Sequence, residues 1–279
     1  MPRSRLRFLV TAAILGIPLL VNYLSTIAPG GFSDINAPLR GPGVIMGERR
    51  DVDGDGVEET IRLLKEPGQD FQLQNLRLEV VDGESTIRIP IESEGFVTAT
   101  LNIIQMDKPP EEEMFVTLVG ANGQHELHGF RAKDGRYKVI FGPKYYLKPG
   151  EFRLEYLGDK KVQFRDLCTG LSVTLDLSEN PSYADFTEAE LERFYNSHRA
   201  WEVTEYSGFS WADLTGDGEK EIIGSRSVTG VTSTDLIGTL QEYYRQEDEV
   251  YKPYAQAFFS PGGVEEAGVI IPKEQKVRE

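Results

Sequence analysis

Two nine-residue segments carry oxygen-bearing side chains at the same relative positions. The segment at 51–59 reads DVDGDGVEE, and the segment at 213–221 reads DLTGDGEKE. Both place an oxygen donor at positions 1, 3, 5 and 9 and glycine at positions 4 and 6. Side chains at alternate positions of a tight loop converge on one point, and glycine allows the sharp turn because it tolerates positive φ. The pattern is therefore typical of a loop that binds a hard cation.

Calcium is the ion that this set of donors favours. Ca²⁺ takes six to eight oxygen ligands, whereas Mg²⁺ takes fewer ligands from protein in a stricter octahedron. Neither loop has a histidine or cysteine nearby, which argues against zinc and copper. The backbone carbonyl at position 7 would add one more oxygen. The predicted ligands are Asp51, Asp53, Asp55, Val57 and Glu59 in the first loop, and Asp213, Thr215, Asp217, Glu219 and Glu221 in the last loop.

An EF-hand and a simple Asp-Gly turn are two other interpretations of these loops. An EF-hand requires a bidentate glutamate at position 12, but Arg62 and Gly224 stand there, and strand-forming residues follow each loop. A single loop of this kind could also be an Asp-Gly turn with solvated acids. Because the same template occurs twice, the calcium interpretation is favoured over the simple turn.

A third, degenerate copy lies between the two. Residues 105–113 keep acids at positions 3 and 9, as Asp107 and Glu113, but Gln105 and Pro109 replace the acids at positions 1 and 5. This leaves too few carboxylates for a good calcium site. The three copies start 54 and 108 residues apart. Such regular spacing indicates repeated β-units, for example propeller blades of about four strands each.

The remaining pattern predicts a mainly β protein with one helix near 187–200. Short apolar or alternating runs are separated by Asp-Gly and Asn-Gly turns, and Leu191, Phe194 and Tyr195 share one helical face after a capping Asp185 or Thr187. We expect a small or irregular β-propeller-like repeat architecture. The expected segments are a Gly- and Pro-rich linker or irregular lead-in at 29–50, a β-repeat domain at 51–260 and a C-terminal tail at 261–279.

The first 28 residues read as a targeting segment. Arg3, Arg5 and Arg7 precede an apolar run, and small residues follow up to Ala28. This order predicts a cleaved signal peptide or, alternatively, an uncleaved membrane anchor through residues 6–24. Positive charge on the N-terminal side predicts that the rest of the chain is translocated. The expected location is extracytoplasmic, either secreted or anchored to the cell membrane.

Composition excludes several classes of protein. The chain has 279 residues, a formal charge of −15 and a single cysteine, Cys168, so it has no internal disulfide framework. Without residues 1–28, the charge is −18, from 27 Lys and Arg against 45 Asp and Glu. Nucleic acid is not an expected partner because binding it requires a basic surface. Nine of the 45 acids lie in the two intact loops, where coordination of a cation explains them.

The loops at Asp51–Glu59 and Asp213–Glu221 resemble those of the FG-GAP/VCBS repeat families of extracellular β-propeller proteins. In those families an Asp-x-Asp-x-Asp-Gly-x-x-Asp/Glu loop joins strands and binds Ca²⁺. The aromatic hairpin Gly238–Phe259 is similar to the strand pair that ends such repeats. The Phe-Gly and Gly-Ala-Pro signatures of the families are not clean here. The resemblance, which extends to small bacterial VCBS-repeat-containing proteins, implies calcium, an extracytoplasmic location and no enzyme activity.

These observations predict a non-enzymatic calcium-binding protein that acts as a binding or adhesion module at the bacterial cell envelope. Its partner would be an envelope glycan or protein that the sequence does not identify. The alternative is a structural envelope or spore-associated accessory protein in which calcium only stabilises the fold. A hydrolase on a propeller scaffold is a third possibility, for which the sequence offers no catalytic residues.

Overall fold

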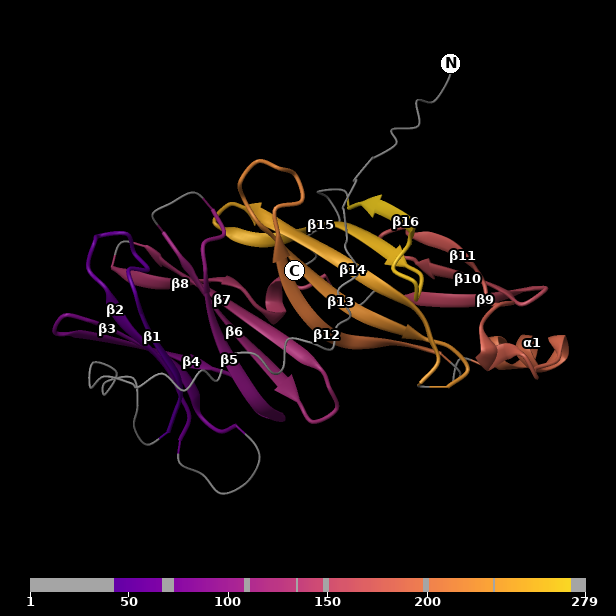
Figure 1. The fold of residues 1–279 in the computed structure, drawn as a ribbon, viewed down its shortest axis with the longest axis horizontal. Helices are drawn as coiled ribbons and strands as arrows, with labels where there is room; N and C mark the ends of the chain where they lie inside the picture. Colours follow the sequence, from indigo (N-terminus) through magenta and orange to yellow (C-terminus); the bar gives the residue numbers. More distant parts are fainter. Residues whose placement is uncertain are drawn as a thin grey trace, which may run out of the picture. The chain divides into compact units, whose positions relative to one another are not determined.

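Four antiparallel sheets follow one another along the chain in the computed structural model (Figure 1). The structure describes residues 43–66, 73–107, 111–133, 135–147, 151–197, 201–232 and 234–271. Each sheet is a meander of consecutive strands, and none of the four closes into a barrel over these residues. The prediction of a mainly β fold with one α-helix is confirmed at this level.

The N-terminal half of the described chain forms two four-stranded sheets, which we call sheet A and sheet B. Sheet A consists of β1 (Val44–Arg50), β2 (Glu59–Leu64), β3 (Leu76–Asp82) and β4 (Ser85–Ile91). Sheet B consists of β5 (Phe96–Ile104), β6 (Glu113–Gly120), β7 (His125–Lys133) and β8 (Arg136–Phe141). A short 3₁₀ turn, η2 (Pro143–Tyr145), follows β8.

The C-terminal half forms a three-stranded and a five-stranded sheet, sheet C and sheet D. Sheet C consists of β9 (Phe152–Gly158), β10 (Lys161–Asp166) and β11 (Ser172–Asp176). The 3₁₀ turn η3 (Pro181–Tyr183) and the helix α1 (Glu188–Asn196) come next. Sheet D consists of β12 (Glu202–Ala212), β13 (Glu221–Thr229), β14 (Leu236–Glu247), β15 (Val250–Phe259) and β16 (Glu265–Ile270).

The helix begins as the sequence predicts. Thr187 is its N-cap, and Thr187 and Glu190 form a reciprocal capping box. Leu191 and Tyr195, one turn apart on the same face, are buried against sheets C and D, and α1 lies beside β9 (Figure 1).

Three strands were not predicted, and each is the edge strand of its sheet. β1 occupies the end of the expected lead-in at 29–50, and β16 occupies part of the expected tail at 261–279, so both expectations are corrected. β12 is the third. An edge strand pairs on one side only, and the sequences of these three lack the apolar alternation that the edge strands β4 and β11 have. β16, for example, reads EEAGVI.

Three clusters of buried side chains hold the sheets together in pairs. One cluster joins sheets A and B and includes Ile61, Leu78 and Leu118. A second joins sheets C and D to α1. A third joins sheets B and D through aromatic residues such as Phe141 and Tyr244, whose ring centroids lie 5.0 Å apart. The packing therefore runs from A to B to D to C, which differs from the order of the sheets along the chain.

The predicted loops occupy equivalent places in three of the sheets. Residues 51–58 connect the first and second strands of sheet A, residues 105–112 those of sheet B, and residues 213–220 those of sheet D. In sheet C, by contrast, the first two strands are joined by a two-residue turn at Asp159 and Lys160, both with positive φ. The repeat seen in the sequence is thus a repeat of strand connections.

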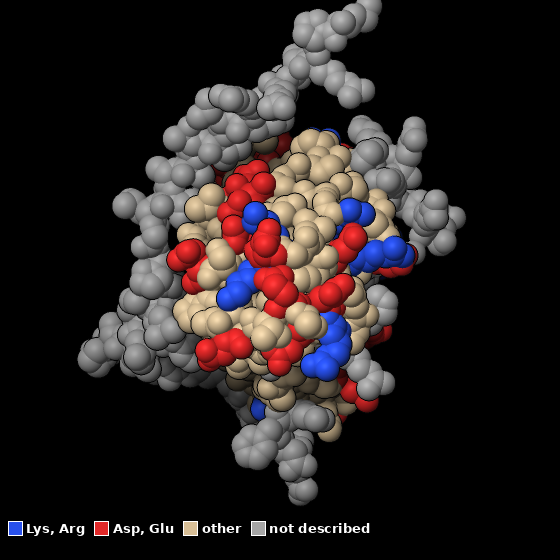
Figure 2. Space-filling model, turned by 90° about the vertical axis from the view of Figure 1, so that its right-hand side faces the viewer, with Lys and Arg blue, Asp and Glu red and all other residues tan. Residues whose placement is uncertain are grey.

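The acidic composition is visible on the surface. Figure 2 shows one face of the molecule, on which acidic side chains are spread widely and basic ones are interspersed. No helix in the described part of the chain is long and apolar enough to cross a membrane. The expected targeting segment at 1–28 lies outside the described residues.

Candidate metal centre

The first loop, residues 51–59, is folded around the carboxylate of Asp51. Asp51 Oδ1 accepts a hydrogen bond from the Gly54 N–H at 2.7 Å, and Oδ2 accepts one from the Gly56 N–H at 2.9 Å. Both glycines have positive φ, 79° and 89°, which they adopt without steric cost. The alternation of Asp and Gly in the sequence therefore produces a tight, internally bonded loop.

Four carboxylates gather in this loop. One ligand oxygen from each of Asp51, Asp53, Asp55 and Glu59 can be chosen so that all four lie within 4.8 Å of one another. One oxygen of Asp53 accepts the Asp55 N–H at 3.2 Å, and one oxygen of Asp55 accepts the Val57 N–H at 2.7 Å. The predicted side-chain ligands of the first loop are therefore brought together. Val57, the predicted carbonyl donor, lies in the exposed part of the loop.

Glu59 is the buried member of the set. Its residue surface is only 1% exposed, and its Oε2 accepts the Val52 N–H at 2.8 Å. Its Oε1 is also buried but has no hydrogen-bond partner among the described residues. Burial raises the pKa of the Glu59 carboxyl, and the nearby carboxylates of Asp53 and Asp51 raise it further. A buried carboxylate oxygen without a partner is costly, and a cation placed here would offset that cost.

The last loop, residues 213–221, repeats the same backbone arrangement. Asp213 Oδ1 accepts the Gly216 N–H at 2.6 Å, and Oδ2 accepts the Gly218 N–H at 3.0 Å. The two glycines have φ of 75° and 90°. Each bond has its counterpart in the first loop at the same relative position. The likeness that the sequence suggested therefore extends to the three-dimensional structure.

The two loops differ in how many carboxylates they bring together. Thr215 stands where the first loop has Asp53. Among the described residues, three or more candidate acidic, histidine or cysteine ligands converge only in the first loop. Glu221 is buried and accepts the Leu214 N–H at 2.8 Å, and burial raises its pKa. Glu219 is exposed, and its N–H donates to Asp217. The last loop thus has the same framework with less negative charge.

The middle loop is described at residues 105–107 and 111–113. Glu113 is fully buried, and its Oε2 accepts the Met106 N–H at 2.9 Å. Asp107 and Glu113, the two acids that the sequence singled out, both bind the guanidinium of Arg131. Arg131 was not identified from the sequence because it lies on β7, far from the loop along the chain.

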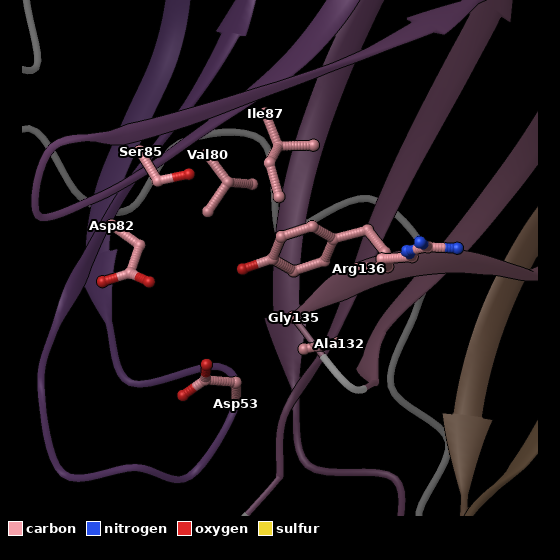
Figure 3. Close-up of a pocket in the computed structure, with 9 residues that line it drawn as sticks. Asp53, Val80, Asp82, Ser85, Ile87, Ala132, Gly135 and Arg136 are labelled. Carbon is pink, nitrogen blue, oxygen red and sulfur yellow. The ribbon is translucent and has the colours of Figure 1, made fainter.

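A small cavity of about 50 Å³ lies beside the first loop (Figure 3). The carboxylates of Asp53 and Asp82 both point into it, and Ser85, Ile87 and Tyr137 also contribute to its lining. Burial raises the pKa of Tyr137, and the acids Glu59, Asp53 and Asp82 raise it further. The cavity therefore brings the carboxylates of Asp53 and Asp82 to one place, with Arg136 of sheet B also in its lining.

A larger open cleft of about 550 Å³ also borders the first loop. Asp53 and Asp55 form one part of its wall. Arg131, Lys133 and Lys138 from sheet B and Glu249 from the β14–β15 turn line other parts. Lys138 Nζ lies 3.3 Å from Glu249 Oε2. The candidate metal loop thus opens onto a polar cleft of mixed charge.

Residues 150–259 match the model of the family described as the YybI C-terminal domain. The matched stretch runs from β9 through α1 to the end of β15, so it includes the last loop and excludes the first. The description of the family names no activity, ligand or partner. No curated protein matches the chain.

Proposed function

We propose that this chain is a calcium-binding β-repeat protein, with one site in the first loop and a second in the last loop. The observation that carries the proposal is the buried Glu59 Oε1, which has no hydrogen-bond partner among the residues that the structure describes and belongs to a group of four converging carboxylates. A bound cation would supply the missing partner and offset the repulsion among the acids. The Glu59 pKa, raised by burial, fits an oxygen prepared for such a partner.

Calcium is proposed over other cations from the chemistry of the donors. All of the side chains that converge are carboxylates, which are hard ligands suited to Ca²⁺. Asp51, Asp53, Asp55 and Glu59 would hold the ion in the first loop, together with the carbonyl of Val57. Asp213, Thr215, Asp217, Glu221 and the carbonyl of Glu219 would hold it in the last loop. When bound, the ion would fix the connection between the first two strands of sheets A and D.

The proposed role is that of a non-enzymatic binding or adhesion module at the bacterial cell envelope. The cleft next to the first loop supports this role, because its polar wall includes Asp53 and Asp55 and could contact an envelope glycan or protein. The position of the loops between paired strands supports the alternative, a structural envelope or spore-associated accessory protein that calcium only stabilises. A panel of envelope glycans and cell-wall fractions would separate the two.

We further propose a small, irregular propeller-like arrangement of the FG-GAP/VCBS kind. Four successive antiparallel meanders support it, and so does the recurrence of the same loop between the first two strands of three sheets. The proposed location is extracytoplasmic, with the chain secreted or held at the membrane by residues 6–24. The order of charges and apolar residues in the first 28 positions supports this location.

Thermal unfolding with calcium and with a chelator tests the proposed calcium binding. Extracellular calcium modules bind with Kd of about 10⁻⁴–10⁻³ M, so millimolar Ca²⁺ should raise the Tm of the chain lacking residues 1–28. At about ten times Kd, each site adds roughly 1.4 kcal/mol. The double variant Asp51→Ala, Asp213→Ala should lose the shift. A shift that survives in this variant would mean that calcium binds elsewhere.

A further inference from the structure

One backbone hydrogen bond is common to all three loops. The N–H at position 2 donates to Oε2 of the glutamate at position 9 in every copy. The three bonds are Val52 to Glu59 at 2.8 Å, Met106 to Glu113 at 2.9 Å, and Leu214 to Glu221 at 2.8 Å. The middle loop has therefore kept this bond, although its sequence has lost two of the ligand positions.

The other oxygen of that glutamate distinguishes the middle loop from the first. In the first loop, Glu59 Oε1 is buried and has no hydrogen-bond partner in the described part of the chain. In the middle loop, Glu113 Oε1 accepts from Arg131 Nε at 2.9 Å and also from the Arg131 terminal amino group. The same amino group lies 2.7 Å from Asp107 Oδ2. The guanidinium thus bridges the acids at positions 3 and 9, which are two of the positions that converge on the candidate ion in the first loop.

The register of the sheets explains how Arg131 reaches this place. Met114 pairs with Phe130, so the adjoining positions put Arg131 directly opposite Glu113 on the next strand. Thr60 pairs with Val81 in the same way, which puts Asp82 opposite Glu59. On this side, the residue facing the position-9 glutamate is therefore a cation in the middle loop and an acid in the first. On its other side, Glu59 pairs with Arg50 of β1, which is exposed and has its Nε 3.9 Å from Glu48 Oε2.

The last loop is intermediate between these two cases. Ile222 pairs with Tyr244, so Arg245 is the residue opposite Glu221. Its guanidinium, however, bonds Glu247 at 3.0 and 3.1 Å and lies 5.1 Å from the centre of the Tyr254 ring. Arg245 is exposed, whereas Arg131 is buried. An arginine opposite the glutamate is thus directed away from the last loop by its own neighbours.

We infer that the Arg131 guanidinium is the resident cation of the middle loop, and that a loop needs a metal ion where no such guanidinium bonds its position-9 glutamate. The middle loop then forms without calcium. In the first loop, Asp82 opposes Glu59 on β3, and Arg50, its partner on β1, is exposed and lies near Glu48, so among the described residues neither strand neighbour places a buried guanidinium at Glu59. The second half of this inference rests on the proposed calcium binding.

Arg131 and the middle loop also connect sheet B to sheet D. The Arg131 terminal amino group lies 2.9 Å from Gln246 Oε1 at the end of β14, and the Lys220 N–H donates to the Met106 carbonyl at 2.7 Å. The middle loop therefore joins sheet B to sheet D. Although burial opposes the charge, Glu113 and Asp107 raise the pKa of Arg131, so the guanidinium remains charged. This contact between sheets would hold at any calcium concentration.

Thermal unfolding in chelator tests the role of Arg131 independently of calcium. Arg131→Gln leaves Glu113 buried without its partner, and breaking a buried ion pair in this way should lower the Tm by roughly 6 °C or more. Arg131→Lys, which keeps the positive charge, should recover part of the loss. Lys138→Gln, an exposed change on the neighbouring strand β8, is the matched control. If Arg131→Lys is no better than Arg131→Gln, or if neither differs from the control, the inference is wrong.

The opposite substitution tests the rule in the first loop. Asp82→Arg should place a guanidinium beside Glu59, lower the number of calcium ions bound per chain by one, and raise the Tm in chelator. Glu84→Arg makes the same charge change in the turn of the same hairpin, outside the register with Glu59. An Asp82→Arg variant that behaves like Glu84→Arg in both measurements would overturn the rule. Should the wild-type chain bind no calcium, the proposed function fails, while the test of Arg131 in chelator stands.

Discussion

Glu58 and Glu59 are neighbours in the sequence but have opposite surroundings. Glu58 is exposed, whereas Glu59 is 1% exposed and has one oxygen without a hydrogen-bond partner. The proposed calcium site depends on the second of these acids. A pair of isosteric substitutions can therefore separate coordination from general negative charge.

We expect Glu59→Gln to weaken calcium binding by roughly tenfold or more, because it removes a ligand charge from the centre of the site. The amide oxygen of glutamine can still accept the Val52 N–H, so the loop should keep its fold. Glu58→Gln removes the same charge from the exposed neighbour and should change the affinity little. Calcium titration calorimetry of both variants is the measurement. Equal losses of affinity would show that only the overall charge matters.

Glu242 is a buried acid outside the loops. It lies on β14, is fully buried, and accepts hydrogen bonds from the hydroxyls of Tyr206 and Tyr244. Arg226 Nη1 lies 3.7 Å from its Oε1. Burial raises the Glu242 pKa above 4.5, and the nearby Asp166 carboxylate adds to this, although Tyr206, Arg226 and Tyr244 oppose it.

The raised Glu242 pKa predicts a pH dependence of stability. An acid with a higher pKa in the folded state than in the unfolded state binds more protons when folded, so its contribution to stability is lost as the pH rises. The Tm of the wild type minus that of Glu242→Gln should therefore fall as the pH rises from 4.5 toward the raised pKa. Unfolding scans in chelator across this range measure it. A difference that stays constant with pH would contradict the expectation.

Among the elements, the interior strands, the helix and five of the edge strands were predictable from the sequence, whereas the edge strands β1, β12 and β16 were not. In β10 the alternation of apolar and polar residues matches the alternation of buried and more exposed positions, and Thr187 is the N-cap of α1. The sequences of β1, β12 and β16 lack a regular alternation of apolar residues, so they carry a weak signal. The spacing of acids and glycines predicted the loops because their backbone hydrogen bonds are local. Arg131 and Asp82 could not be found in this way, since only strand register brings them to the loops.

The two intact loops should differ in affinity. The first gathers four carboxylates, whereas the last has a threonine at position 3, and affinity rises with the number of charged ligands. In a calcium titration, Asp51→Ala should therefore remove the tighter binding step and Asp213→Ala the weaker one. Loss of the tighter step in Asp213→Ala would reverse this order.

At the scale of the whole molecule, three buried clusters connect the four sheets in the order A, B, D and C. The sequence predicted repeated β-units but not this order, because the order depends on aromatic contacts between distant strands, such as Phe141 with Tyr244. The stretch similar to the YybI C-terminal domain covers sheets C and D as far as β15. The middle loop lies at the contact between sheets B and D, and the candidate calcium loops lie on either side of it along the chain.

Calorimetric titration of the chain lacking residues 1–28 with Ca²⁺ tests the central claim most directly. We expect two ions per chain with Kd of about 10⁻⁴–10⁻³ M or tighter. One should bind at each intact loop, and none at the middle loop, whose acids bind Arg131. Removing any bound metal with a chelator before the titration should leave the number of calcium ions bound per chain unchanged. The absence of binding heat at millimolar Ca²⁺, together with a Tm that is the same in calcium and in chelator, would contradict the claim.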